Sequence, residues 1–443
     1  MIKLKAFLLS LVLVIATLAL LNVTYVKKID DYYKVKDNSI RYSTSYEKYK
    51  SRDILTSNIT PNTLVLMGSS ELVATINEDY HPNKIFNYND FNIMQIGTSY
   101  SQNIIQATTL GSIEGSMSKR KVAIVESVQW FEKDGTHQDA FLNKASQEHI
   151  FHMLDNDKIS KETKEKIINR IIEITKGNKQ QNDIYKKYKS YFIDGKGTIV
   201  DKKLLEFENA MYSFKLKQTF YQKHAKSDYP SLGDKTPDYD WQKMTDQFVE
   251  EVKKKTDNND YAVDNNYYNT YLKDRYASLK DSNKDLSYLE SPEYSDMELF
   301  LTVAKELGIE VEVIIFPVNG KWNDYTGVSR EMREKTYKKI EDVAKSHGAT
   351  VLNYGNREYD DYFLFDVMHV GVKGWMEVEK ELSESFKSFL LASATMSPLF
   401  LESAVSFPKE KLSVEIKSKN IMSVNVPEMK FVKEEMEGSI FPY

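Results

Sequence analysis

The first 28 residues constrain the chain most, because the run from Ala6 to Val23 contains no charged side chain. At a rise of ~1.5 Å per residue, a helix over this run nearly spans the ~30 Å hydrocarbon core of a bilayer. Lys3 and Lys5 precede the run without an acidic residue, which favours an amino terminus in the cytoplasm and a body outside. The alternative is a cleaved signal peptide, but no A-x-A-like site follows the run. We expect residues 1–28 to form a retained single-pass anchor in the cell membrane.

The composition of the remaining chain is that of a globular protein. With 443 residues, of which 41% are hydrophobic, it can form one large α/β domain with an insertion or two smaller domains. The 60 basic and 65 acidic residues are mixed along the chain, so nucleic acid is not an expected partner. The absence of cysteine excludes disulfides, a thiol nucleophile and any cysteine-ligated metal.

Short apolar runs predict the strands of a parallel sheet that is buried on both faces. The four runs are Thr63–Met67, Lys121–Val128, Ile309–Phe316 and Ala349–Asn353. Helical stretches separate them, which indicates βαβ units. The sequence Ser295 to Glu298 reads as a capping box for a helix that ends at Gly308. The fold class is therefore α/β, a parallel sheet flanked by helices.

The chain divides into four predicted parts. Residues 29–60 form a membrane-proximal stalk after the anchor, and residues 61–393 form the α/β domain. That domain carries a helical insertion at about residues 132–292 and ends in a helix over 372–391. Residues 394–443 are a tail to which the patterning assigns no role.

Two apolar faces support helices within the insertion, since their members recur at spacings of three and four. One face is Ile167, Ile168, Ile171 and Ile174, and the other is Leu204, Phe207, Met211 and Phe214. We expect the insertion to pack beside the sheet and to cover or shape the mouth of the active site.

A serine follows the first predicted strand in the segment Leu66 to Leu72, which reads LMGSSEL. A serine at this point can project from a strand-to-helix turn, with its own backbone N–H free to donate to an oxyanion. We assign Ser69 as the helix cap and Ser70 as the nucleophile. The alternative is that the serines only cap the helix.

The second chemical element is the pair Asp366 and His369. An aspartate three residues before a histidine can orient the imidazole and stabilise the imidazolium that forms during proton transfer. The alternatives are a surface pair or half of a metal site. Metal binding is disfavoured because no other cluster with ligand spacing stands out, and no metal or cofactor is predicted.

The segments GSSEL and DVMHVGVKGW look like the first and last blocks of SGNH hydrolases. More narrowly, the chain resembles the DltD family through an amino-terminal anchor and further segments in the same order. These are Met67 to Leu72, Ser127 to Phe131, Pro317 to Gly320 with Asp324 to Gly327, and Asp366 to Trp375. The resemblance covers about residues 1–393.

That resemblance implies an SGNH-like fold and a role in D-alanylation of lipoteichoic or related teichoic acids at the outer face of the membrane. It also implies three partners: teichoic acid, a membrane-bound O-acyltransferase of the same pathway and, less directly, the D-alanyl carrier protein.

The resemblance further implies a role for individual residues. Ser70 would be the nucleophile, His369 the general base and acid, and Asp366 its orienting carboxylate. The oxyanion donors would be the backbone N–H groups of Ser70 and Gly97 and the side chain of Gln129. Two positions depart from the general SGNH pattern, because Ser69 stands where many members have aspartate and Gln129 where asparagine is expected.

A third group of residues follows the predicted strand Ile309–Phe316. Asn319, Trp322 and Tyr325 are candidates for the lining of the acceptor channel. The alternative is an ordinary loop packed by its aromatic side chains.

Two rival functions stay open at this point. The same triad in an open, wet site would hydrolyse D-alanyl esters or thioesters, so that transfer depends on excluding water from Ser70. A chain with an inert serine and histidine would instead be a non-catalytic membrane scaffold that recruits the D-alanyl carrier protein.

Overall fold

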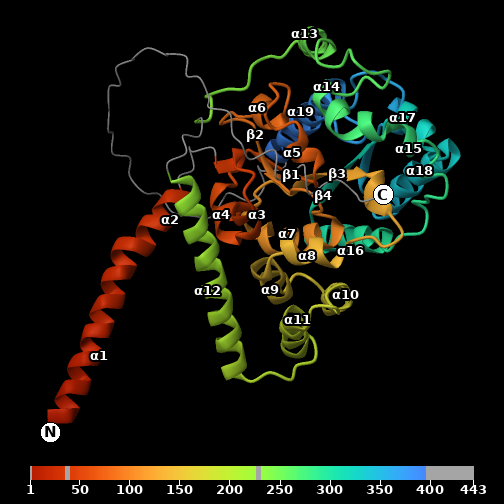
Figure 1. Ribbon diagram of the computed structural model, residues 1–443. Helices are drawn as coiled ribbons and strands as arrows, with labels where there is room; N and C mark the ends of the chain where they lie inside the picture. Colours follow the sequence, from red (N-terminus) through yellow and green to blue (C-terminus); the bar gives the residue numbers. More distant parts are fainter. Residues whose placement is uncertain (1, 35–39, 226–230, 396–443) are drawn as a thin grey trace, which may run out of the picture. The chain divides into compact units, whose positions relative to one another are not determined.

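The computed structural model describes residues 2–34, 40–225 and 231–395 (Figure 1). Its centre is a sheet of five parallel strands in the order β2-β1-β3-β4-β5. The strands are β1 Thr63–Met67, β2 Asn92–Ile96, β3 Lys121–Ser127, β4 Glu310–Phe316 and β5 Thr350–Asn353. Every residue of β1, β2 and β3 is buried, as expected for a sheet covered on both faces.

Four strands confirm the predicted runs to within a residue at either end, but β2 was missed. Its sequence, NIMQI, is not a continuous apolar run, because it contains the polar residues Asn92 and Gln95, and both are nonetheless buried. Each polar side chain has a partner: the Thr63 hydroxyl donates to Asn92 Oδ1 over 2.6 Å, and Gln95 Nε2 donates to the Leu72 carbonyl over 2.6 Å. Burial of these two polar side chains is tolerated because their hydrogen-bond partners, Thr63 and Leu72, lie in other segments of the chain. The residues of β2 alone therefore did not indicate a buried strand.

Helices lie on both sides of the sheet. Figure 1 shows α7 (Asn103–Ile113) and α16 (Glu293–Glu306) on one side and the short helices α5 (Glu71–Ala74) and α6 (Pro82–Ile85) on the other. Helix α18 (Arg330–Ser346) connects β4 to β5 and packs on both strands. The contacts divide the chain after Val378, within the last helix, α19 (Val372–Thr395), and the fold described here is that of the first part.

The predicted capping box at Ser295 was wrong. Helix α16 begins at Glu293, so Ser295 and Asp296 lie in its first turn instead of preceding it. Asp296 is buried and accepts from Arg170 Nε over 3.0 Å. Asp296, the residue after the predicted cap Ser295, thus forms an ion pair with the insertion.

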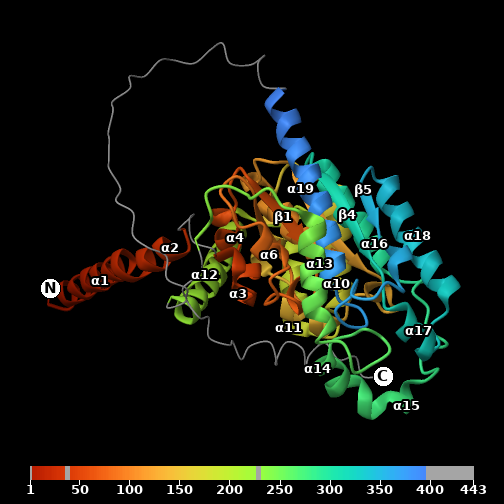
Figure 2. The same ribbon diagram turned by 90° about the horizontal axis from the view of Figure 1, so that it is seen from above.

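Helices make up most of the described residues between β3 and α16, the region of the insertion predicted at about residues 132–292. Its helices are α8 Gln138–Lys144, α9 Gln147–Asp155, α10 Lys161–Ile174, α11 Lys179–Phe192, α12 Ile199–His224, α13 Trp241–Lys253, α14 Asn265–Tyr267 and α15 Tyr276–Leu279. Figure 2 shows the same helices from above. The isoleucine face of α10 is buried in the main core. The predicted apolar face of α12 is not buried, because Leu204, Phe207 and Met211 are exposed.

The amino-terminal helix α1 (Ile2–Leu21) continues through a π-helical turn into α2 (Lys27–Tyr33). Among the described residues it is the one helix long and apolar enough to cross a membrane. The predicted stalk packs on the domain: α2 and α4 (Arg52–Asn58) form a small core with α12, in which Ile29, Ile54 and Phe220 are fully buried. Helix α3 (Tyr46–Lys50) joins the same group of helices.

Candidate active site

The candidate site lies where β1 and β2 end, because the carboxyl ends of parallel strands meet at one edge of a sheet. Ser70 follows β1 and begins α5, and Gly97 follows β2. The two turns touch closely: the Gly68 N–H donates to the Ile96 carbonyl over 3.2 Å, and Gly97 has φ of 140°. A Cβ atom on Gly97 would stand 1.9 Å from the Gly68 carbonyl oxygen. Only glycine allows this close approach between the turn after β2 and the turn after β1, and these turns carry the two predicted backbone oxyanion donors.

The two serines after Gly68 have different surroundings. The Ser69 hydroxyl is buried and donates to the Thr98 carbonyl over 3.3 Å, so it does not cap α5 as predicted. Ser70 is the residue at the start of α5, and its side chain makes no capping hydrogen bond. Ser70 is half-buried, and no partner for its hydroxyl is found in the described part of the chain.

Asp366 and His369 form a rigid pair. His369 Nδ1 and Asp366 Oδ2 are 2.7 Å apart, and Asp366 Oδ1 accepts from the backbone N–H groups of Met368 and His369 over 2.9 and 2.8 Å. The Phe365 N–H donates back to the His369 carbonyl over 2.8 Å. The turn therefore fixes both the carboxylate and the ring. With Nδ1 held by the carboxylate, the neutral imidazole presents Nε2 as its acceptor.

The charges of the pair support proton transfer at His369. Burial of Asp366 opposes its ionisation, but the His369 charge and the hydrogen bonds outweigh this and hold the pKa of Asp366 below its ordinary value. Burial lowers the pKa of His369, but the charge and hydrogen bond of Asp366, with the charge of Glu71, raise it above its ordinary value. A raised pKa makes this imidazole a stronger base than an isolated histidine.

The structure brings the Ser70 and His369 segments to the same part of the fold. Trp375 Nε1, one turn into the helix after His369, donates to the Thr75 hydroxyl at the end of α5 over 2.9 Å. The charge of Glu71, the neighbour of Ser70, also acts on His369. Ser70 and His369 share no hydrogen bond, and within the described residues the buried His369 Nε2 has no partner. Such contacts are often long without substrate.

Glu71 is a residue that the sequence reasoning missed. Its carboxylate is buried and accepts three hydrogen bonds: from the Ser69 N–H over 3.2 Å, from Gln129 Nε2 over 3.1 Å and from Trp130 Nε1 over 3.2 Å. Gln129, the predicted third oxyanion donor, thus donates one N–H of its side-chain amide to Glu71, and the second N–H of that amide is left to bind an oxyanion. The available signal was the glutamate directly after Ser70 in GSSEL.

A buried polar network extends from Glu71 into the core. Gln102 Nε2 donates to the Trp130 carbonyl over 3.1 Å and to Glu293 Oε2 over 3.3 Å, and the Asn103 N–H donates to Glu293 Oε1 over 2.8 Å. Asn103 Nδ2 donates to Glu126 Oε2 at the end of β3. Burial and the Asp296 charge raise the pKa of Glu293 to about 8. The turn that carries Gln129 is therefore supported by the start of α7 and of α16.

Asn319, Trp322 and Tyr325 lie next to the His369 turn but are engaged in packing. Asn319 Oδ1 caps α17 (Gly320–Thr326), and its Nδ2 donates to the Tyr261 carbonyl over 2.9 Å. Trp322 and Tyr325 join a cluster that also contains Tyr261 and Val367. These contacts favour the packing alternative for Asn319 and Trp322, and they make the aromatic cluster a wall beside the turn.

Comparison with known proteins places the chain in a family. The model of the DltD protein family matches residues 41–387. Protein DltD of Bacillus subtilis is 31% identical over 340 residues, which cover 75% of this chain and 85% of that protein. The chain belongs to the DltD family. Protein DltD of Staphylococcus aureus is 25% identical over 73% of this chain and 80% of its own length.

The DltD family assignment confirms the resemblance on which the predicted role depends. It gives the chain a role in D-alanylation of teichoic acid, and the apolar helix α1 agrees with a membrane-associated protein. The five-stranded parallel sheet confirms the α/β class.

The carboxyl-terminal part of this DltD chain is similar to a second family. The family model of the ATP synthase D subunit matches residues 364–442. The D subunit of the V-type ATP synthase of Fusobacterium nucleatum is 90% identical over 68 residues, which are 15% of this chain and 32% of that protein. The chain thus spans about a third of the length of that relative. Most of the predicted tail, residues 396–443, lies outside the described residues.

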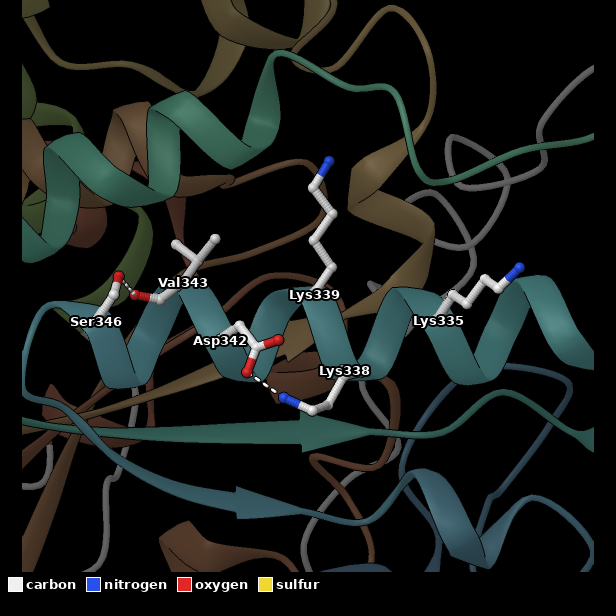
Figure 3. Close-up of a pocket in the computed structure, with 6 residues that line it drawn as sticks. All are labelled: Lys335, Lys338, Lys339, Asp342, Val343 and Ser346. Carbon is white, nitrogen blue, oxygen red and sulfur yellow. Dashed lines mark hydrogen bonds and ion pairs between the residues drawn. The ribbon is translucent and has the colours of Figure 1, made fainter.

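A hollow of about 410 Å³ on α18 lies apart from the candidate site (Figure 3). Three lysines line it, but each has a partner. Lys335 pairs with Glu331, Lys338 with Asp342, and Lys339 donates to the Leu289 carbonyl. These exposed lysines and their partners on α18 are typical of a solvated helix face.

Proposed function

We propose that this chain is a serine acyltransferase that transfers D-alanyl groups to teichoic acid at the outer face of the membrane. The observation that carries the proposal is the Asp366–His369 pair. Its carboxylate is locked by hydrogen bonds, and the imidazole keeps Nε2 without a partner among the described residues. The pair lies in the same part of the fold as Ser70, which follows the end of β1.

The first half-reaction forms an ester on Ser70. Its Oγ attacks the carbonyl carbon of a D-alanyl donor while His369 Nε2 accepts the hydroxyl proton. The backbone N–H groups of Ser70 and Gly97 and the second N–H of Gln129 donate to the oxyanion. Collapse of the tetrahedral intermediate expels the donor's leaving group, which takes the proton from His369.

The second half-reaction transfers the acyl group to the polymer. A teichoic acid hydroxyl attacks the ester as His369 accepts its proton, and Ser70 then leaves with that proton. Water must be kept from the ester for transfer to prevail over hydrolysis. The end of the insertion supports this function, because the Asp264 N–H donates to the Phe365 carbonyl over 3.0 Å and the Tyr261 carbonyl accepts from Asn319. These contacts hold aromatic side chains over the His369 turn.

The orientation and the partners follow from the anchor. Lys3 and Lys5 favour a cytoplasmic amino terminus and an extracellular domain. A D-alanyl donor charged in the cytoplasm would then have to be passed across the membrane, which is consistent with the membrane-bound O-acyltransferase as a partner and the carrier protein as an earlier donor.

The test is covalent labelling of the purified chain with a fluorophosphonate. We expect Ser70 to displace fluoride and to appear as a modified peptide in mass spectrometry, and we expect His369→Ala to lose the adduct. Ser69→Ala and His347→Ala are the matched controls and should retain it. Labelling of His369→Ala at the rate of the unmodified chain would refute the proposed role of the histidine.

A second experiment separates transfer from its rivals. Incubation with D-alanylated lipoteichoic acid that releases free D-alanine, without transfer to an added acceptor polymer, would favour the esterase. A Ser70→Ala chain that still supports D-alanylation in cells would favour the scaffold that recruits the D-alanyl carrier protein.

A further inference from the structure

One face of α12 is apolar and uncovered. Ile199, Val200, Leu204, Phe207 and Met211 are 78, 71, 53, 63 and 52% exposed. Outside α1 and the π-helical turn that follows it, the exposed large hydrophobic side chains of the described residues are these five together with Tyr46 and Tyr359. The last four members follow one another at spacings of four, three and four, so they form a single stripe along the helix.

The same stripe continues onto the segment that follows the membrane anchor. Phe214 and Gln218 are its next members, and Gln218 Nε2 donates to the Tyr25 hydroxyl over 3.1 Å. Lys28 Nζ lies 5.8 Å from the centre of the Tyr221 ring. Figure 1 shows α12 beside α2, in agreement with these contacts. The juxtamembrane segment thus occupies one half of the α12 face, and the side chains of the other half, called the bare half below, are exposed.

We propose that the bare half, from Ile199 to Met211, rests on the lipid surface of the membrane that α1 enters. We infer lipid as the partner because the two halves belong to one face of α12. The covered half contacts Tyr25 and Lys28, which directly follow the membrane helix α1. At ~1.5 Å per residue, Met211 lies ~10 Å along α12 from Gln218 and Ile199 lies ~30 Å from it, so the bare half begins next to the juxtamembrane contact.

The polar residues of α12 determine how deep the helix lies. Lys203 and Glu206 form an ion pair on the same turns as the stripe, and Glu208 is exposed. These charges exclude burial in the hydrocarbon core. A helix with one apolar face and charged flanks lies in the interface between water and acyl chains. The domain is then held at two points, α1 and α12, which fixes how the candidate site faces the membrane. The proposal requires α1 as an anchor but does not depend on the chemistry of Ser70.

The absence of cysteine permits a direct test on the intact chain. Single-cysteine variants Phe207→Cys and Met211→Cys carry an environment-sensitive fluorophore in nanodiscs of phosphatidylcholine and phosphatidylglycerol. We expect blue-shifted emission and severalfold stronger quenching by lipids with a shallow nitroxide than for Glu331→Cys, an exposed control on α18. Quenching as weak as at Glu331 would overturn the proposal.

Two further outcomes distinguish other occupants. A blue shift without quenching by the labelled lipids would mean that protein covers the stripe, and this result would also overturn the proposal. The mass of the assembly would then show whether the covering protein is a second copy of the chain. Leu204→Glu combined with Phe207→Glu should reduce quenching at Met211→Cys. Both side chains are exposed, so thermal unfolding of this variant should match that of the parent chain. Unchanged quenching at Met211 would contradict the proposal.

Discussion

The two sides of the candidate site differ in how strongly they are held. On the His369 side, Asp366 accepts from two backbone N–H groups and from the ring, so the imidazole is fixed without a substrate. On the Ser70 side, the hydroxyl has no partner among the described residues, and the fixed groups are its neighbours Ser69 and Glu71.

This difference suits a reaction that uses the serine twice. A nucleophile that becomes an ester and is then released needs room to change its bonds, whereas the base must keep one geometry throughout. The preorganised side should therefore tolerate substitution least. On the open Ser70 side, activity should depend on the residues that support the serine, above all Glu71 and the turn that carries Gln129.

The largest effect of breaking the rigid side is expected for Asp366→Asn. Loss of the carboxylate removes the acceptor that sets the tautomer of His369, so kcat/KM for D-alanyl transfer should fall by about 10⁴-fold. The pKa of His369 lies above its ordinary value, and in the proposed mechanism its neutral form is the base. Without Asp366 that pKa falls, so the acid limb of the pH profile should shift to lower pH. Asp361→Asn, a change at an exposed position of the same loop, is the control.

The next effect concerns the oxyanion donor on the open side. Gln129→Ala should lower kcat by about 10²-fold or more with little change in KM, because the lost hydrogen bond forms mainly in the transition state. Gln129→Asn keeps an amide on a shorter arm and should lose less. Steady-state transfer assays on both variants give the comparison. An unchanged kcat in Gln129→Ala would mean that this side chain only supports Glu71.

Glu71→Gln tests the support of the open side. Gln keeps the size of the residue but replaces one acceptor of the three hydrogen bonds by a donor, so Ser69, Gln129 and Trp130 should shift. A misplacement of this kind should cost roughly 10-fold to 10²-fold in kcat. Because the charge of Glu71 contributes to the raised pKa of His369, the acid limb should also move to lower pH. A purely structural role would lower the rate and leave the pH profile in place.

The sequence was sufficient where the signal is local. The apolar run before Gly68 predicted β1 and the position of Ser70, and the three-residue spacing of Asp366 and His369 predicted a pair that one turn brings into contact. It was insufficient where a buried polar residue finds its partner far along the chain. Asn92 in the missed strand pairs with Thr63, and Glu293 pairs with Asn103. No spacing rule connects such positions.

Periodicity also has a limit that α12 illustrates. The spacing of Leu204, Phe207 and Met211 correctly predicted a helix with an apolar face. Periodicity says which side chains share a face and not what covers it. The tail shows a different limit: its similarity to the D subunit of ATP synthases is visible only in comparison with known proteins, because its patterning carries no motif.

The smallest expected effect is on stability and concerns the network behind the open side. Burial, with the Asp296 charge, raises the pKa of Glu293 to about 8 from an ordinary 4.5. The folded chain therefore binds this proton more tightly than the unfolded chain. Its contribution to stability is complete below pH 4.5 and is lost as the pH rises through about 8.

Glu293→Gln removes that titration while keeping the shape of the side chain. Between pH 5 and pH 8, the decline in the free energy of unfolding should become shallower by up to about 1.4 kcal/mol per pH unit. Urea unfolding of both chains across this range measures the slope, and Glu331→Gln on the surface of α18 should leave it nearly unchanged. Parallel slopes in the parent chain and in Glu293→Gln would mean that Glu293 is ionised throughout. In that case the network that supports the Ser70 side would contain an ionised Glu293 carboxylate and not a protonated Glu293.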